Sequence, residues 1–134
     1  MSDHKKNNSA LCPKRSFCPL TNALDILGDK WTMIVIRDML FFEKKQFNDF
    51  LSSPEGISTN ILTERLKRLE EHKIIKKTPY QKNPVRYEYT LTKKGSDLMP
   101  AMINLIEWGL VHIKGTAKPP PELIKKFLNK NRKQ

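Results

Sequence analysis

The stretch from residue 46 to residue 92 limits the possible folds of this chain more than any other feature of the sequence. It opens with Phe47, Phe50 and Leu51, whose i, i+3, i+4 spacing predicts a short helix. A turn rich in Ser, Pro and Gly at residues 52–56 separates it from a second, strongly patterned helix. Two short strands joined by a polar loop follow. This order predicts a helix-turn-helix with a β-hairpin wing, and helices and two-stranded ribbons are the elements that fit a DNA major groove.

The second helix of this pair has a predicted buried seam and an opposite polar face. Ser58 is a favourable N-cap, and Leu62, Leu66 and Leu69 recur at the spacing of one helical face. Polar side chains can meet base edges, so this is the candidate reading helix. Its opposite face carries Asn60, Thr63, Glu64, Lys67, Arg68 and Glu71.

Individual side chains on this face match particular parts of DNA. Asn60 can pair with adenine, Thr63 can meet a thymine methyl group or a phosphate, and Lys67 can reach guanine or a phosphate. Glu64 repels phosphate, so it fits DNA only by accepting from a cytosine amine or by pairing with Lys67 or Arg68. The alternative is a solvated face on which a Glu64–Arg68 pair supports the helix by about 0.3 kcal/mol. The predicted base-reading set is Ser58, Thr59, Asn60, Thr63, Glu64 and Lys67.

The predicted wing adds a second group of cations. Ile74 and Ile75 open its first strand, and residues 85–91 alternate apolar and polar side chains, the pattern of a half-buried second strand. Cations around the tip at residues 81–84 can straddle a phosphate backbone or enter the minor groove. Lysines can also protect an edge strand from aggregation, and both roles are compatible. The predicted backbone contacts are Arg68, Lys76, Lys77, Lys82 and Arg86.

Helices on both sides of this unit carry more apolar surface than one winged helix needs. The first is predicted from Pro19 to a stop at Gly28, and Asp29 caps the next helix. Thr92 is predicted to cap a long helix that Pro100 kinks or loosens. A helix that is apolar nearly all round must be buried on two sides. Either its own domain covers both sides, or a second copy of the chain covers one of them in a homodimer. We favour the homodimer. The predicted interface is Leu20, Leu24, Leu98, Met102, Leu105 and Trp108.

The charge of the chain favours an anionic partner. Its 134 residues include 25 Lys and Arg against 14 Asp and Glu, a formal net charge of +11. Nucleic acid is the leading partner and an acidic membrane surface the other. No apolar run approaches the about 18 residues that span a bilayer, and no secretory signal is evident. We expect a cytoplasmic protein with a flexible basic arm at 1–16, one domain at 17–115 and a Pro-interrupted basic helix or tail at 116–134.

The only two cysteines, Cys12 and Cys18, matter as thiols if the compartment is reducing. Cys18 precedes a predicted helix start and has Lys14 and Arg15 nearby, and both unpaired N–H groups and cations stabilise a thiolate. The alternative is a half-buried Cys18 that acts as a small hydrophobe near the dimer seam. Cys12 either resolves an oxidised Cys18 or is incidental.

Short motifs between residues 17 and 112 form a specific ordered set, although each is weak alone. They are Cys18-Pro19, Gly28-Asp29-Lys30-Trp31, Phe47-Asn48-Asp49-Phe50-Leu51, Gly56-Ile57-Ser58, Leu62-Thr63-Glu64-Arg65-Leu66, Val85-Arg86-Tyr87-Glu88-Tyr89-Thr90-Leu91-Thr92 and Glu107-Trp108-Gly109. With them the chain resembles the HxlR-type transcriptional regulators, winged-helix relatives of the MarR group. Cys12 and the tail at Pro119–Pro121 depart from the family pattern.

The resemblance implies a bacterial or archaeal cytoplasmic regulator that binds double-stranded DNA. It implies a homodimer whose two reading helices meet successive major grooves. It also implies that Cys18, which precedes Pro19, corresponds to a cysteine that senses thiol-reactive electrophiles or oxidants in some members. The expected fold is α+β and mainly α, a winged helix-turn-helix with extra N- and C-terminal dimerisation helices.

Two other classes of function fit the sequence less well. An enzyme is not expected, because no Gly-rich phosphate loop, nucleophile elbow or catalytic cluster appears. No metal or other cofactor is expected, because His4, His72 and His112 lack ligand spacing with the cysteines. The alternative is a winged-helix module for protein or RNA, which should expose apolar residues where this chain has Asn60 and Lys67. We therefore expect a homodimeric, sequence-specific regulator on a palindromic promoter site, with oxidation or alkylation of Cys18 as its candidate switch.

Overall fold

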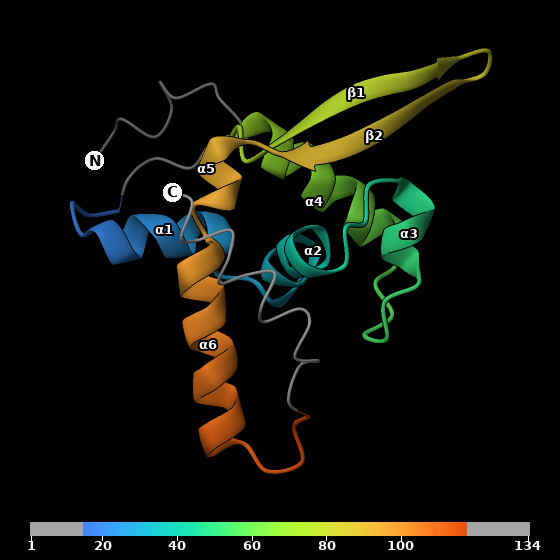
Figure 1. Ribbon diagram of the computed structural model, residues 1–134. Helices are drawn as coiled ribbons and strands as arrows, with labels where there is room; N and C mark the ends of the chain where they lie inside the picture. Colours follow the sequence, from blue (N-terminus) through green and yellow to red (C-terminus); the bar gives the residue numbers. More distant parts are fainter. Residues whose placement is uncertain (1–14, 118–134) are drawn as a thin grey trace.

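A computed structural model describes residues 15–117, which form a winged helix flanked by an N-terminal and a C-terminal helix (Figure 1). This part is mainly helical with one two-stranded antiparallel sheet, which confirms the predicted fold class. Most of the predicted arm and tail, with His4, Cys12 and Pro119–Pro121, lies outside the described residues. The elements are α1 (Pro19–Leu27), α2 (Lys30–Phe41), α3 (Phe47–Leu51), α4 (Thr59–Glu71), β1 (Ile75–Lys82), β2 (Val85–Leu91), α5 (Lys93–Ser96) and α6 (Met99–His112).

The hydrophobic core joins α2, α4, the base of the hairpin and the start of α6. Leu62, Leu66 and Leu69 are buried, which confirms the predicted seam of α4. Burying each such side chain stabilises the fold by about 1.5–3 kcal/mol. The core is completed by Val35, Ile36, Met39, Leu40, Phe50, Ile57, Ile74, Ile75, Met99 and Met102.

Local sequence signals set the helix boundaries around the turn. Asp29 caps α2 by accepting from the backbone N–H groups of Trp31 and Thr32, and the Ser58 hydroxyl caps α4 by accepting from Ile61. Both caps agree with the prediction. Gly56 lies in the turn between α3 and α4 with a φ of +73°, a conformation that glycine adopts without a steric penalty. These signals place α3 and α4 in helix-turn-helix order.

The expectation of one long helix after Thr92 is wrong, because the chain forms two helices there. The Thr92 hydroxyl caps the four-residue α5, and α6 begins separately at Met99 with Pro100 in its first turn. Proline lacks an N–H and its ring blocks the preceding turn, so a helix restarts at this point rather than continuing. Gly95 permits the close packing of α5, since a Cβ there would lie 2.3 Å from the carbonyl oxygen of Ile74.

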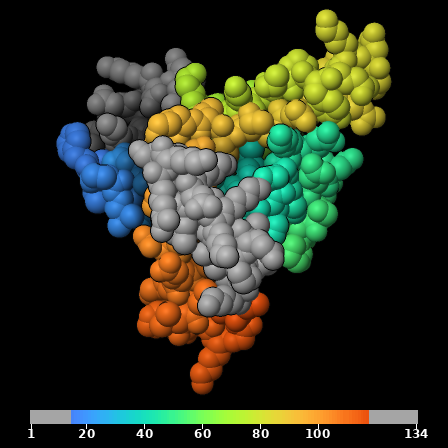
Figure 2. Space-filling view, in the orientation of Figure 1, coloured from blue at the N-terminus to red at the C-terminus, as the bar shows by residue number. Residues whose placement is uncertain are grey.

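The hairpin projects away from the helices, on the opposite side of the molecule from α6 (Figures 1 and 2). Ile75 pairs with Leu91 at its base and Lys82 with Val85 at its outer end. The Tyr89 N–H donates to the Lys45 carbonyl at 2.7 Å, which ties the hairpin to the segment before α3. The predicted half-buried character of β2 is found in its inner half, where Tyr89 and Leu91 are partly buried against the core. Val85 and Tyr87 in its outer half are 55% and 40% exposed. The outer half extends past the core, which leaves these two side chains exposed.

Candidate nucleic-acid interface

One face of α4 is lined by exposed polar side chains, as the sequence predicted. Its residues are held in place from beneath by the leucine seam and at the N-terminus by the Ser58 cap. The Thr63 hydroxyl donates to the Thr59 carbonyl at 2.8 Å, and its oxygen can still accept from a ligand. The exposed set is Ser58, Thr59, Asn60, Thr63, Glu64 and Lys67.

Glu64, the acidic residue on this face, has a cationic partner. Arg65 pairs with it through Nη1. The predicted Glu64–Arg68 pair is therefore replaced by a pair between adjacent residues. The charge of Glu64 is offset within α4, which reduces its repulsion of phosphate.

Arg68, which the sequence predicted as a backbone contact, is turned toward the rest of its own chain in the structure. Its side chain is 28% exposed, and Nη2 donates to the Ile26 carbonyl at 2.6 Å and to Asp29 Oδ2 at 3.2 Å. A pattern of about 100° per residue puts Arg68 at the edge of the polar face, and the carboxylate of Asp29 draws it inward.

Asp29 accepts from several groups besides Arg68. Arg65 Nε donates to Oδ1 at 2.9 Å, and the amides of Trp31 and Thr32 donate to the same oxygen at 3.0 Å. Burial raises the pKa of Asp29, but hydrogen bonds from Thr32 and Arg65 outweigh burial and hold this pKa well below its usual range. The carboxylate is thus ionised and partnered on both oxygens.

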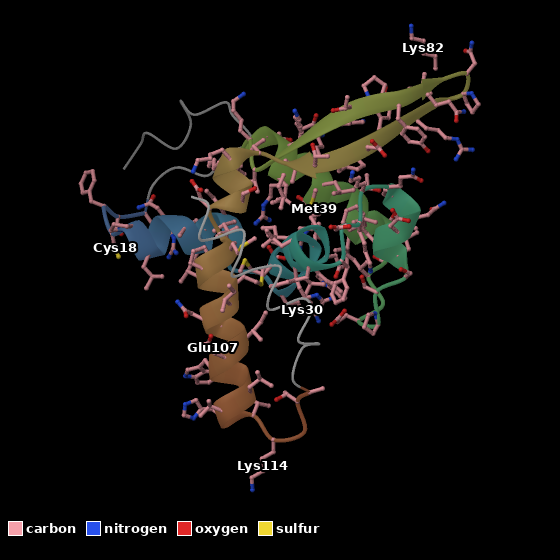
Figure 3. The ribbon with its side chains drawn as sticks, in the orientation of Figure 1. Cys18, Lys30, Met39, Lys82, Glu107 and Lys114 are labelled. Carbon is pink, nitrogen blue, oxygen red and sulfur yellow. The ribbon has the colours of Figure 1, made fainter. Side chains whose placement is uncertain are left out.

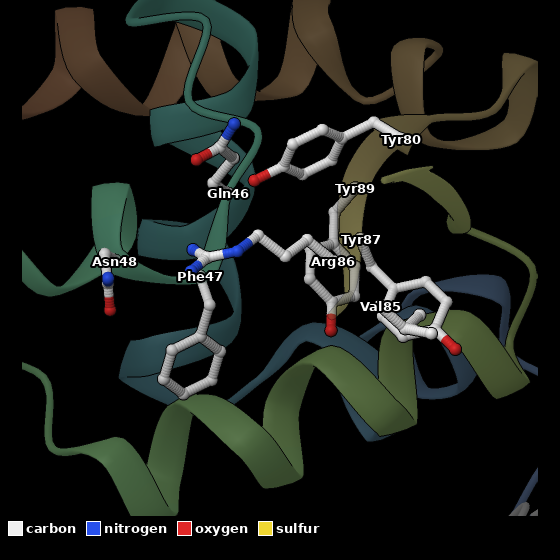
Figure 4. A pocket seen from close by; sticks show the side chains of 8 residues that line it. All are labelled: Gln46, Phe47, Asn48, Tyr80, Val85, Arg86, Tyr87 and Tyr89. Carbon is white, nitrogen blue, oxygen red and sulfur yellow. The ribbon is translucent and has the colours of Figure 1, made fainter. Parts of the chain in front are cut away.

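The cations of the wing are exposed but are spread along the hairpin rather than gathered at the tip. Lys76 and Lys77 pair with Thr90 and Tyr89 near its base, and Lys77 Nζ lies 4.2 Å from the centre of the Tyr87 ring. Lys82 lies at the outer end (Figure 3). Arg86 extends from β2 toward Phe47 of α3 instead of continuing past the tip (Figure 4).

A cleft of about 200 Å³ separates the wing from α3, and Arg86 lies in it. Tyr80 reaches into the same cleft with its hydroxyl toward Gln46 (Figure 4). Sequence reasoning missed Gln46, Asn48 and Tyr80 as neighbours of Arg86. Asn48 and Tyr80 are exposed, and the only available signal was that Asn48 lies in the first turn of the helix before the turn. The cleft adds hydrogen-bonding groups beside the cations that the sequence predicted.

A buried ionic cluster fixes the turn that precedes α4. Asp38 is 1% exposed and accepts from Lys44 at 3.3 Å, Arg37 at 2.8 Å and the Ser53 hydroxyl. Arg37 also pairs with Glu55 at 2.7 Å, and hydrogen bonding to Glu55 raises the pKa of Arg37. The cluster connects α2 to the turn that precedes α4.

Cys18 is an exposed free thiol at the N-cap of α1 (Figure 3). The backbone N–H and hydroxyl of Thr21, followed by the N–H of Leu20, favour the thiolate and lower the pKa of Cys18. Arg15, which the sequence suggested as a stabilising cation, instead pairs with Asp25 at 2.6 Å. In the single chain Cys18 is not the half-buried hydrophobe of the alternative interpretation.

Apolar side chains remain exposed on α1 and α6. Leu20 and Leu24 are 64% and 51% exposed, and Leu105 and Trp108 are both 59% exposed. Met102, predicted for the dimer interface, is 5% exposed and belongs to the core of its own chain. Leu98 is half-buried and packs against that core. The apolar surface of α6 is therefore divided between an inner face and an outer one.

A family model for HxlR-like helix-turn-helix proteins matches residues 26–116, which leaves out Cys18 and all of α1 except its last two residues. The chain belongs to the HxlR-like helix-turn-helix family. Its sequence is 37% identical over 92 residues to the uncharacterized HTH-type transcriptional regulator sll1512 of Synechocystis sp.. That match covers 69% of this chain and 67% of the relative, and matches to three mycobacterial relatives cover 63% of those proteins.

Solved structures of a redox regulator and of a MarR-family regulator share the fold. The redox regulator HypR in its reduced form matches with a TM-score of 0.65 at 31% identity, over 72% of this chain and 95% of HypR. A MarR-family transcriptional regulator of Porphyromonas gingivalis matches with a TM-score of 0.64 at 27% identity, over 75% of this chain and 98% of that one. The recognised family resemblance and its MarR relation are confirmed, and no catalytic family is indicated. Within the described residues no helix is long and apolar enough to cross a membrane.

Proposed function

We propose that this HxlR-family protein is a sequence-specific regulator that binds double-stranded DNA through the exposed face of α4. The observation that carries the proposal is the polar face itself, with Asn60, Thr63 and Lys67 exposed on a helix anchored by its leucine seam. A surface for an apolar protein partner would present apolar groups there. The exposed Lys82 and Arg86 of the wing flank α4 with the positive charge that phosphates require.

A homodimer is the second part of the proposal. The exposed apolar residues of α1 and α6 form a surface that a second copy can cover. The interface residues are revised to Leu20, Leu24, Leu105 and Trp108, since Met102 is buried and Leu98 packs against the core of its own chain. A two-fold axis would set two α4 helices on half-sites about 34 Å apart, which matches a palindromic promoter site.

The third part is a thiol switch at Cys18. Its exposure and lowered pKa make a nucleophilic thiolate available in the cytoplasm, where we expect the protein to act. HypR, which has solved reduced and oxidised forms, is a redox regulator of similar fold. We therefore propose that oxidation or alkylation of Cys18 changes the affinity for DNA.

A binding titration tests the first part. Labelled duplex from the promoter upstream of the protein's own gene is compared with a scrambled duplex and a single-stranded RNA of equal length. The proposal expects promoter affinity at least about 10³-fold above that for the scrambled duplex. Equal weak binding to both duplexes would contradict it, and tighter binding to RNA would favour the interaction-module alternative.

Substitution of Asn60 tests the base-reading role within the same assay. Asn60→Ala should cost about 1–3 kcal/mol at one adenine-containing base pair and leave other positions of the site unchanged. Affinities for a set of single-base-pair variants of the promoter duplex measure this. Lys67→Ala is the matched control, for which the loss should be nearly uniform over the set. A uniform loss for Asn60→Ala would remove it from the reading set.

A further inference from the structure

Asp29, Arg65 and Arg68, here called the α4 clamp, join α4 to the junction between α1 and α2. Arg68 bridges two acceptors, the Ile26 carbonyl at 2.6 Å and Asp29 at 3.2 Å. Arg65, about one turn earlier on α4, donates to Asp29 at 2.9 Å. Asp29 itself is the N-cap of α2, a helix of the core. The clamp therefore fixes α4 to two other helices at once.

The clamp meets α1 at the end by which that helix is attached to the core. α1 has no buried residue, and Ile26 and Leu27 at its C-terminal end pack against the core. Leu20 and Leu24 on the preceding turns are exposed. A displacement of α1 must therefore move the Ile26 carbonyl that Arg68 holds. Cys18 begins this same helix (Figure 3).

The geometry of the clamp favours arginine over lysine. Arg68 donates to the carbonyl and to the carboxylate from one nitrogen, Nη2, whose two N–H directions are fixed in the plane of the guanidinium. An ammonium is a compact point charge on a flexible stem and holds no such fixed directions. The side chains of Arg65 and Arg68 are 20% and 28% exposed, so both groups are partly shielded from water. Loss of either arginine would leave the charge of Asp29 less compensated.

We propose that Arg68 is a positioning residue, which transmits the position of α1 to α4 through the Ile26 carbonyl without contacting DNA. This inference rests on the proposed function and adds the route by which a modification at Cys18 reaches the exposed face of α4. The Cys18 thiolate adds to an electrophilic carbon–carbon double bond, such as that of N-ethylmaleimide, and the adjacent carbon takes up a proton from water. The adduct at the N-cap displaces α1, Ile26 moves with it, and Arg68 carries α4 to a new angle. α4 is a continuous helix, so a movement near Arg68 also moves Asn60.

The test uses the full chain with Cys12→Ser, which leaves Cys18 as the only thiol. In this background Arg68→Gln, Arg68→Lys and the matched control Lys67→Ala are compared. Affinity for the promoter duplex is measured over a series of salt concentrations, before and after alkylation of Cys18 with N-ethylmaleimide. Hydrogen exchange of the amides of residues 19–28 is measured without DNA, and thermal unfolding confirms that each variant folds.

The proposal expects Arg68→Gln to lower affinity about tenfold while the slope of log K against log salt stays unchanged. Lys67→Ala should instead reduce that slope by about one. Alkylation should change the affinity of the parent and of Lys67→Ala but have little effect on Arg68→Gln. Arg68→Lys should behave like Arg68→Gln despite its charge, and both should speed exchange over residues 19–28.

Three results would overturn the inference. They are a slope reduced by about one in Arg68→Gln, full rescue by Arg68→Lys, or unchanged exchange in α1. Absence of promoter-selective binding by the parent would contradict the proposed function instead. The exchange measurement needs no DNA, so it separates failure of the clamp from failure of the proposed function.

Discussion

At the scale of single residues, the described part of the chain uses carboxylates to hold its helices together. Asp38 is buried among Arg37, Lys44 and Ser53, and Asp29 combines a helix cap with ion pairs to α4. Removing one partner of such a carboxylate lowers the free energy of unfolding by more than a surface ion pair contributes, because it leaves charges or donors without compensation.

The pH dependence of stability tests the role of Asp29. The folded pKa of Asp29 lies below its unfolded value, so its contribution is complete above the unfolded value of about 3.9 and declines as pH falls below it. Asp29→Asn should lower the free energy of unfolding at pH 7 by about 1–3 kcal/mol. The variant should also lose less stability than the parent as the pH falls below about 4. Urea unfolding at a series of pH values measures both.

The control for this prediction is Asp97→Asn. Asp97 forms an exposed pair with Lys93, whose contribution should not exceed about 1 kcal/mol. An Asp29→Asn variant as stable as this control, with the acid sensitivity of the parent, would show that Asp29 does not hold α4.

The reactivity of Cys18 is a second property set by neighbouring groups. Thr21 lowers the pKa of the thiol through its backbone N–H and its hydroxyl. Thr21→Val removes the hydroxyl only, so the pKa of Cys18 should rise and alkylation at neutral pH should slow. The pH profile of the iodoacetamide reaction, in the Cys12→Ser background, measures the shift. Thr116→Val is the control, and an unchanged midpoint for Thr21→Val would exclude a contribution from this hydroxyl.

At the scale of elements, local signals predicted the helix-turn-helix well. The Asp29 and Ser58 caps, the leucine seam of α4 and the two strands depend on neighbours in sequence, and the structure has all of them. The ion pair of Arg68 with Asp29 could not be predicted from local signals, because the two residues are 39 positions apart and only tertiary packing brings them together. The direction of Arg86 depends likewise on how the hairpin meets α3.

The wing supplies a prediction at this scale. If Lys82 and Arg86 meet phosphates, Lys82→Ala and Arg86→Ala should each reduce the salt slope of promoter binding by about one. Lys114→Ala is the control, since Lys114 follows α6 at the opposite side of the molecule (Figure 3). A slope unchanged in the wing variants would show that the wing does not touch the DNA backbone.

At the scale of the whole molecule, the sequence predicted that the C-terminal helix is apolar, but not which of its apolar residues are exposed. Periodicity identified a helix with apolar residues nearly all round. It could not predict that Met102 is buried while Leu105 is exposed, because the burial of Met102 depends on where α6 crosses the core. The break at Pro100 fixes that crossing. Contacts within one chain account for the inner face and leave Leu105 and Trp108 on the outer face exposed.

Dimerisation through this face has a direct test. Leu105→Glu should shift the protein from dimer to monomer, because a buried unpaired charge opposes association. Sedimentation velocity measures the mass of each species. Val85→Glu introduces the same charge at a similarly exposed apolar residue of the wing and should leave the dimer intact. A dimer unaffected by Leu105→Glu would place the interface elsewhere.

A hydroxyl-radical footprint of the unmodified protein on the promoter upstream of its own gene tests the central proposal most directly. A homodimer that reads DNA with two α4 helices should protect two half-sites whose centres lie about 10–10.5 base pairs, or a multiple of this, apart. Uniform weak protection along the fragment, or one protected half-site without a symmetric partner, would contradict a dimeric, sequence-specific regulator.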